Sequence, residues 1–329
     1  MRTRIKASGI VALFITAFLI GLVFVLIPPA RDKKDTAGNT AQAEPTGKDS
    51  RTASSKPVIA VSILPHSYFV KRIGGDSVSV LTLVGAGQSP HTYEPTPRQM
   101  EELSKAQVWI LSGTDFEDRI KPKVASLYPN LKLIDGTAGV KFRTLEAHEH
   151  DHEDQIAKST ETPRTLGLER DRHTWLGKEP AEILAGHVRD ALSWLVPEKG
   201  GEFRKNYDAL VREIESEFEG LKRDLSSLRG RSVYVYHPAF GYFLDEFGIA
   251  QQAVETGGKE PNPQTLATLI QKARADKVKV IFLQAQFPTQ AAKTLAKELN
   301  AEVVALDPLS ENWLENIRKM GEALKKAAQ

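Results

Sequence analysis

The sequence predicts an α/β protein with two parallel-sheet lobes, joined by a long rigid helix, and a metal cleft between the lobes. Short β-branched runs alternate with helical patterns in two separate stretches of the chain, which is typical of parallel sheets. Between these stretches, apolar residues recur at three-and-four spacing over a long segment, which predicts a long helix. The chain has 329 residues, of which 41% are hydrophobic, enough for two modest cores.

The expected strands are rich in Val, Ile and Leu and are bounded by turn-forming residues. In the first stretch they are residues 58–64, 78–84, 108–111 and 131–134, with a helix at 98–105. In the second stretch they are residues 232–236, 251–254, 278–283 and 302–306, with helices at 263–275 and 289–299.

The segment between the two stretches is expected to be helical. It contains one helix at 180–195 and another at 201–228, which would reach roughly 40 Å at 1.5 Å per residue. We therefore divide the folded chain into an N-terminal lobe (57–179), linking helices (180–229) and a C-terminal lobe (230–329).

The N-terminus predicts a membrane-targeting segment. Residues 1–8 carry three basic side chains, and residues 9–28 are uncharged and apolar, long enough to span a bilayer. By the positive-inside rule, residues 1–8 are cytoplasmic and the rest of the chain is extracytoplasmic, in the periplasm or on the cell surface. We favour an uncleaved anchor over a cleaved signal, in which case residues 29–56, polar and rich in small residues, are a flexible tether.

Some functions are excluded by composition and by missing motifs. The net charge is only +2, and basic and acidic residues are interspersed, which argues against nucleic-acid binding. No phosphate-binding or dinucleotide-binding glycine motif occurs, so the chain is expected neither to hydrolyse ATP nor to hold a dinucleotide.

Four residues are candidate metal ligands. The chain has no cysteine, so a transition-metal site must use imidazole and carboxylate groups. His237 and Asp307 directly follow expected strands, and His91 follows another through a glycine-rich loop. His173 stands just before the helix at 180–195. Because ligands of parallel sheets gather beyond the carboxyl ends of the strands, these side chains are expected to meet in one cleft.

These residues lie in segments that resemble a known family. The segments are Gly87-Gln88-Ser89-Pro90-His91-Thr92-Tyr93-Glu94-Pro95-Thr96-Pro97, His173-Thr174-Trp175-Leu176, Tyr236-His237-Pro238-Ala239-Phe240-Gly241-Tyr242-Phe243, Gly258-Lys259-Glu260-Pro261 and Leu306-Asp307-Pro308-Leu309. In order and spacing they resemble the metal-binding solute-binding proteins of ATP-binding-cassette importers, especially the zinc-binding periplasmic branch. The resemblance covers residues 56–329.

The resemblance implies a function and a ligand set. It implies a binding protein, not an enzyme, that captures Zn²⁺ with His91, His173, His237 and Asp307 and delivers it to the membrane permease subunit of an importer. Manganese-selective relatives tend to carry glutamate at the third position, so His237 favours zinc over Mn²⁺. We expect a monomer, and an affinity that falls below about pH 6.5 as protons compete for the histidines.

Residues 146–154 form a run of histidines and carboxylates. His148, His150 and His152 are candidates for a weaker accessory metal site, as in similar loops of the zinc branch, or for a solvated insertion without a role. The run also matches the H-E-x-x-H metalloprotease pattern. Since residues 148–155 include no apolar residue that could dock this segment on a core, we interpret that match as accidental.

Two classes of alternative function remain open. One is a manganese or iron carrier, or an adhesin, on the same scaffold, and the other is a membrane-anchored zinc hydrolase. Of the remaining histidines, His66 is expected to line the cleft or form a hydrogen bond, and His187 is assigned no function.

Overall fold

The computed structural model describes residues 56–145, 170–255, 261–284, 286–287 and 290–327. All of them belong to one compact unit, Ala53–Gln329. In this part of the chain, no helix has both the length and the apolar character needed to cross a membrane. The expected span at 9–28 and the histidine-rich run at 146–154 lie outside the described residues.

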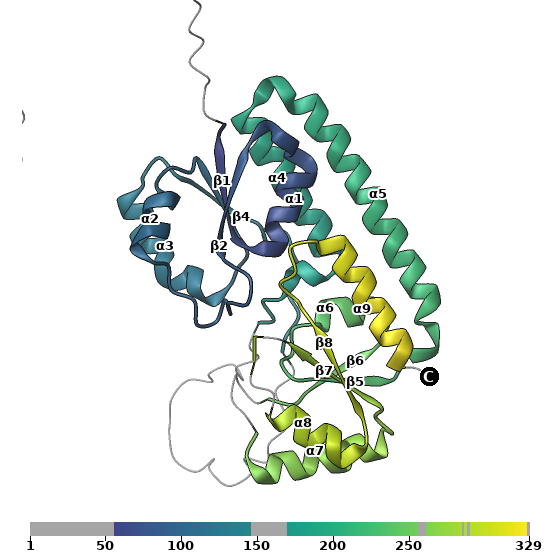
Figure 1. The fold of residues 1–329 in the computed structure, drawn as a ribbon. Helices are drawn as coiled ribbons and strands as arrows, with labels where there is room; N and C mark the ends of the chain where they lie inside the picture. The colour runs from purple at the N-terminus through teal and green to yellow at the C-terminus, as the bar shows by residue number, and fades with distance from the viewer. Residues whose placement is uncertain (1–55, 146–169, 256–260, 285, 288–289, 328–329) are drawn as a thin grey trace, which may run out of the picture. The chain divides into compact units, whose positions relative to one another are not determined.

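The N-terminal lobe is built on a four-stranded parallel sheet (Figure 1). Its strands, in the spatial order β2-β1-β3-β4, are β2 (Ser79–Val84), β1 (Val58–Ile63), β3 (Val108–Leu111) and β4 (Lys132–Asp135). β1 and β3 are almost completely buried, as expected for central strands covered by helices on both faces.

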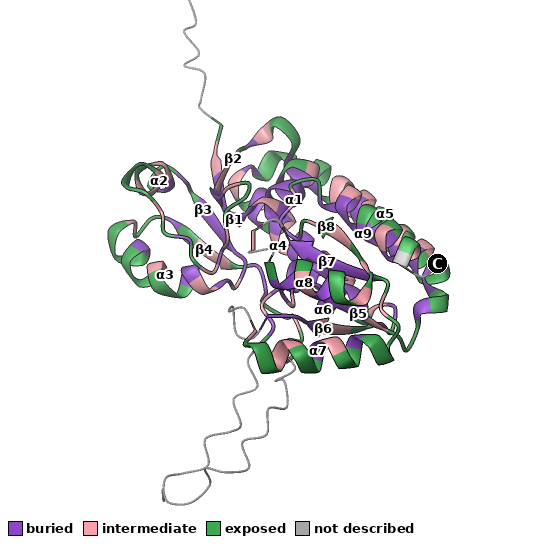
Figure 2. Ribbon diagram, turned by 60° about the horizontal axis from the view of Figure 1, so that its bottom comes forward, coloured by how far each residue is buried: buried purple, intermediate pink, exposed green. Residues whose placement is uncertain are grey.

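The C-terminal lobe repeats this arrangement. Its parallel strands, in the order β6-β5-β7-β8, are β6 (Ala250–Ala253), β5 (Ser232–Val235), β7 (Val280–Gln284) and β8 (Glu302–Leu306). β7 is buried along its whole length (Figure 2). The predicted fold class is therefore confirmed: there are two parallel sheets of the same topology.

The helices described in the structure cover the sheets and connect their strands. They are α1 (Leu64–Gly74), α2 (Pro97–Leu103), α3 (Asp115–Leu127), α4 (Lys178–Leu195), α5 (Gly200–Asp224), α6 (Gly241–Asp245), α7 (Pro263–Ala275), α8 (Gln290–Leu299) and α9 (Trp313–Ala327).

The predicted long helix is α5, with 25 residues, and it packs against both lobes. It contacts α1 of the N-terminal lobe, the linking helix α4, and α9 of the C-terminal lobe. Its buried residues recur at three-and-four spacing. Salt bridges also join it to both lobes, through Arg72–Glu213 to α1 and Arg318–Glu217 to α9.

Several predicted boundaries differ from the structure by one or more residues, and two of these differences have a clear local reason. The long helix ends at Asp224, before the predicted end at 228, because residues 226–228 form a 3₁₀ turn. The strand expected from residue 278 begins at Val280, because Lys277 adopts a left-handed conformation (φ 54°) after α7 and the amide of Val278 bonds back to Ala273.

Candidate metal centre

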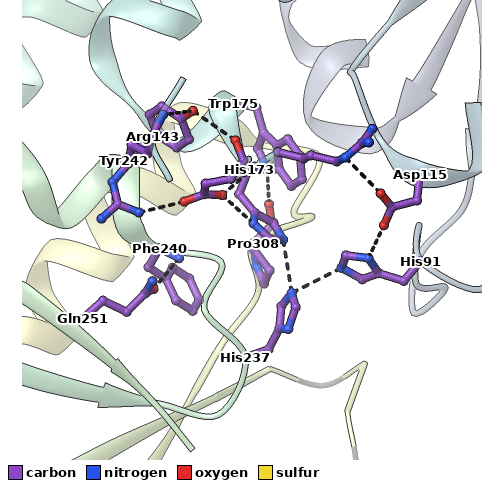
Figure 3. Close-up of polar contacts among 12 residues, drawn as sticks. His91, Asp115, Arg143, His173, Trp175, His237, Phe240, Tyr242, Gln251 and Pro308 are labelled. Atoms are coloured by element: carbon purple, nitrogen blue, oxygen red, sulfur yellow. Dashed lines mark hydrogen bonds and ion pairs between the residues drawn. The ribbon is translucent and has the colours of Figure 1, made fainter. Parts of the chain in front are cut away.

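Three of the four candidate ligands, His91, His173 and His237, come together in the structure (Figure 3). One nitrogen of each ring lies within 4.8 Å of the corresponding nitrogens of the other two rings. The Nε2 atoms of His91 and His237 are 3.2 Å apart, and those of His237 and His173 are 3.1 Å apart. Among the described residues, these three form the only such cluster of candidate ligands.

The fold explains this convergence. His91 lies in the loop after β2, and His237 lies two residues beyond the end of β5. His173 begins the 3₁₀ turn Thr174–Leu176 that leads into α4. The histidines that follow β2 and β5 thus lie beyond the carboxyl ends of their strands, where parallel sheets present their ligands.

Each histidine forms a hydrogen bond to a carboxylate through Nδ1, the ring nitrogen that does not face the other two histidines. The Nδ1 atoms of His91, His173 and His237 lie 2.7 Å from Asp115, 2.9 Å from Asp171 and 3.0 Å from Glu255, respectively. An ionised carboxylate can only accept a hydrogen bond, so each Nδ1 must be the protonated nitrogen. In the neutral rings, the Nε2 atoms then carry lone pairs, and these lone pairs face one another.

Three facing lone pairs repel one another unless a cation lies between them, so this arrangement fits a metal ion. Carboxylate–imidazole pairs of this kind orient metal-binding histidines. A tetrahedral Zn²⁺ with Zn–N bonds of about 2.0–2.1 Å places its nitrogen ligands about 3.3 Å apart. The two Nε2–Nε2 distances, 3.2 and 3.1 Å, are close to that spacing.

The three histidines differ in burial. The side chains of His173 and His237 are 8% and 10% exposed, whereas that of His91 is 37% exposed. Burial lowers the pKa of His237 to about 4, which keeps its ring neutral at physiological pH. Metal binding requires neutral imidazole, so burial prepares His237 as a ligand.

The backbone around His237 is also fixed. Gln284, at the end of β7, donates from Nε2 to the carbonyl of His237 and accepts the amide proton of His237 with Oε1. The ring of Phe287 stacks on the imidazole, with centroids 4.4 Å apart. These contacts restrain the ring position before any metal arrives.

Asp171, which holds His173, is the centre of a buried network. It is 0% exposed and accepts from both Nδ1 and the backbone amide of His173. Arg143 donates to its second oxygen at 2.8 Å and also pairs with Asp245 of α6. Burial raises the pKa of Asp171, but the bonds from His173 and Arg143 outweigh it and leave the pKa below its usual value.

A pair of tryptophans ties the histidine site to the segment after β8. Trp175 donates from Nε1 to the carbonyl of Pro308 (2.7 Å), and Trp313 donates to the carbonyl of Trp175 (2.6 Å). Trp175, Pro308 and Leu309 line the same pocket as the three histidines. The N-terminal lobe's His173 segment is therefore bonded directly to the C-terminal lobe.

Asp307, the fourth candidate ligand, is not part of the histidine cluster. Its carboxylate is exposed, and Oδ1 accepts from the side chain of Gln286 and the amide of Leu309. It precedes Pro308 and Leu309, which line the pocket. Its role as a ligand stays a prediction.

The carboxylates behind the histidines were missed in the sequence. Asp115 starts α3 after β3, Glu255 lies two residues beyond the end of β6, and Asp171 is two residues before His173. The strand-end argument used for the histidines applies equally to Asp115 and Glu255 and could have found them.

The structure does not place His66 in the pocket, so its expected role as a residue that lines the cleft is not supported. Its side chain does not line the pocket, and its buried Nδ1 has no hydrogen-bond partner among the described residues. It is the third residue of α1 and is buried, because the strand before it ends at Ile63 and α1 begins at once with Leu64. His187 is remote from the pocket and bonds to the carbonyl of Ala138. His148, His150 and His152 lie outside the described residues.

Comparison with known proteins places the chain in a family. The model of the family described as "Zinc-uptake complex component A periplasmic" (ZnuA) matches residues 59–327. The zinc-binding lipoprotein AdcA of Streptococcus pneumoniae R6 is 28% identical over 284 residues, covering 83% of this chain and 54% of AdcA. The zinc-binding protein AdcA of Streptococcus pyogenes serotype M3 (MGAS315) is 25% identical over 276 residues, covering 82% and 53%. The chain spans about half the length of these two relatives.

Solved structures agree with this result. A crystal structure of ZnuA matches with a TM-score of 0.75 and 30% identity, covering 84% of this chain and 100% of that chain. A ZnuA deletion mutant with zinc bound matches with a TM-score of 0.73 and 32% identity, covering 84% and 99%. From the match over residues 59–327 we conclude that the chain belongs to the ZnuA family of periplasmic zinc-uptake components.

Proposed function

We propose that this protein captures Zn²⁺ outside the cytoplasmic membrane and delivers it to the permease of an ATP-binding-cassette importer. The observation that carries the proposal is the convergence of three Nε2 atoms, each on a ring whose Nδ1 bonds a carboxylate. The ZnuA and AdcA relatives, described as zinc-uptake and zinc-binding proteins, support the same cargo.

Zinc is the cargo that this ligand set favours. Imidazole is a softer donor than carboxylate or water, and Mn²⁺ prefers oxygen ligands and higher coordination numbers. A manganese or iron carrier would be expected to offer more oxygen atoms to the ion than this cluster does. Competition between Zn²⁺ and Mn²⁺ at equal free concentrations tests the choice.

We propose Asp307 as the fourth ligand. Its Oδ1 atom is held by Gln286 and Leu309, whereas no hydrogen bond to its second oxygen is described. Pro308 and Leu309, which follow Asp307 directly, line the pocket that contains the three histidines. If Asp307 binds the ion, Asp307→Asn weakens zinc binding, and Gln286→Ala does not.

We propose transport rather than catalysis. Three imidazoles are also the donor set of some zinc enzymes, which keep the fourth position open for water. Here family membership favours transport, and a fourth protein ligand would close that position. Zinc-loaded protein should hydrolyse neither peptide nor phosphate ester substrates. Turnover abolished by His173→Ala would instead identify a zinc hydrolase.

Residues 1–56 are proposed to tether the protein to the membrane. The family is described as periplasmic, and the pneumococcal AdcA is named a lipoprotein. The sequence of this chain contains no cysteine that could carry a lipid. We therefore propose that residues 9–28 serve as the anchor, residues 29–56 as the tether, and residues 57–329 as a monomeric metal-binding part. Membrane fractionation with N-terminal sequencing tests whether the anchor is retained.

The central experiment measures zinc binding directly. Protein purified without added metal, stripped with a chelator and titrated with Zn²⁺ against a competing chromophoric chelator should take up one tight equivalent. A strain lacking the protein should grow poorly only when zinc is scarce. Failure of the stripped protein to bind Zn²⁺ at neutral pH would rule the proposal out.

A further inference from the structure

The three carboxylates behind the histidines differ in their own charge partners. Asp115 accepts from His91 with Oδ2, and its Oδ1 lies 3.0 Å from Nε of Arg172. Asp171 accepts from His173 with Oδ1, and its Oδ2 lies 2.8 Å from Nη1 of Arg143. Each of these two carboxylates thus has a guanidinium on the side away from its histidine.

Among the residues that the structure describes, Glu255 has no such partner. Its Oε1 atom lies 3.0 Å from Nδ1 of His237, and its side chain is only 3% exposed. Its Oε2 atom is buried without a hydrogen-bond partner, and within the described ranges no lysine or arginine forms an ion pair with it. Because a buried charge without a counter-ion destabilises the folded state, a Glu255 without a counter-ion among the described residues is expected to lower stability.

The compensating charge can come from the other side of the His237 ring. A cation bound at Nε2 polarises the imidazole, strengthens the bond from Nδ1–H to the carboxylate and supplies positive charge on the same axis. Asp115 and Asp171 already have that compensation from arginine. The negative charge of Glu255 should therefore stabilise a bound divalent cation more than the charge of Asp115 or Asp171 does.

We propose that Glu255 is a positioning residue whose negative charge is balanced only when a divalent cation occupies the histidine cluster. In this role it couples cation binding to stability: it weakens the metal-free protein and strengthens the metal-bound one. The inference rests on the proposed function, because it takes the three histidines as the cation site.

The variant Glu255→Gln tests this role because it keeps the size of the side chain and removes the charge. In the metal-free protein the midpoint of thermal unfolding should rise by about 2–4 °C, as expected for roughly 1 kcal/mol in a domain of this size. The affinity for Zn²⁺, measured by chelator competition, should fall by about 10–100-fold, as it does when outer partners of metal ligands are changed. A residue needed only for packing would lower the metal-free midpoint instead.

Asp171→Asn is the matched control, since Asp171 holds His173 in the same way but has an arginine partner. Removing its charge leaves Arg143 with less compensation, so the metal-free midpoint should fall while Zn²⁺ affinity also decreases. The tautomer of His237 gives a further readout. Two-bond ¹H–¹⁵N NMR spectra should show the proton on Nδ1 in the wild type, and a smaller share of that tautomer in Glu255→Gln.

The outcomes separate the inference from the proposed function. A lower metal-free midpoint for Glu255→Gln, or a Zn²⁺ affinity within about threefold of wild type, overturns the role of Glu255 while wild-type binding stands. If the wild-type protein takes up no Zn²⁺, the proposed function is wrong. The metal-free comparison of the two variants still decides whether the charge of Glu255 is uncompensated.

Discussion

The Nε2 atoms of His173 and His237 lie 3.1 Å apart, although the two residues are 64 positions apart in the sequence. His173 leads into α4, and His237 follows β5 of the C-terminal lobe. Neither segment contains a metal site by itself. The site forms only when both lobes fold and pack together. Metal binding at this site therefore requires the whole unit to be folded.

Removing either buried histidine should abolish tight zinc binding. His173→Ala and His237→Ala each delete a nitrogen that faces the common point, so we expect affinity to drop by more than the roughly 100-fold typical of changes to outer partners. Chelator competition measures the loss. His187→Ala is the control, because His187 does not line the pocket and bonds to the carbonyl of Ala138. Equal affinities for the His187 and His237 variants would contradict the site.

The protonation of His237 gives a second prediction. Because burial lowers its pKa to about 4, the ring should stay neutral and able to bind metal well below pH 6.5. An NMR titration of the metal-free protein should therefore show a midpoint near pH 4 for His237. A midpoint near 6.5 would mean that the ring is hydrated, and that zinc and protons compete at this residue in the neutral range.

Part of the fold and part of the metal site could be predicted from the sequence alone. Strand periodicity was sufficient for the two sheets, and the residue types beyond the strand ends pointed to His91 and His237. His173 precedes a helix, so the strand-end argument does not predict it. The pairing of His91 with Asp115 could not be predicted in the same way, because it depends on how a loop after β2 turns toward the start of α3. Asp307 has the expected position in the sequence, but the direction of its carboxylate is set by Gln286 and Leu309.

His66 predicts how stability depends on pH. Burial lowers the pKa of His66 to about 3, whereas in the unfolded chain it is about 6.5. Between these values the unfolded state binds a proton that the folded state does not, so the free energy of unfolding falls as the pH falls from 6.5 toward 3. The slope from this one residue is at most about 1.4 kcal/mol per pH unit.

The variant His66→Gln isolates this contribution. Urea denaturation of metal-free protein between pH 7 and 4 should show a smaller loss of stability for the variant than for the wild type. His187→Gln should retain the wild-type slope. Identical slopes for His66→Gln and the wild type would show that His66 is protonated in the folded protein.

The tryptophan pair predicts a cross-lobe contribution to stability. Trp175→Phe removes the N–H that bonds the carbonyl of Pro308 and leaves that carbonyl without a donor. We expect the free energy of unfolding to fall by about 1–3 kcal/mol. Trp194→Phe is the control, since Trp194 is 53% exposed and contacts the ammonium of Lys132, and its effect should stay within about 0.5 kcal/mol. Equal effects of the two substitutions would show that the indole bond contributes nothing.

Two glycines allow a matched test of the network behind His173. A Cβ on Gly241 would lie 1.8 Å from Nη1 of Arg143, so Gly241→Ala must displace the guanidinium from Asp171. Loss of that partner from a fully buried carboxylate should cost up to about 3–5 kcal/mol and loosen His173, which lowers zinc affinity. For Gly186, inside α4, no heavy atom of the described residues outside the surrounding backbone of its own helix lies within 4 Å of the position of its Cβ.

Gly186→Ala should therefore raise the free energy of unfolding by about 0.5–1 kcal/mol, the usual gain when alanine replaces glycine inside a helix, and leave zinc affinity unchanged. Chemical denaturation and chelator competition on both variants measure the contrast. Because both changes add one methyl group, their opposite signs would come from the surroundings alone. If Gly241→Ala kept wild-type affinity and stability, Arg143 could move away without consequence, and Asp171 would hold His173 without its arginine.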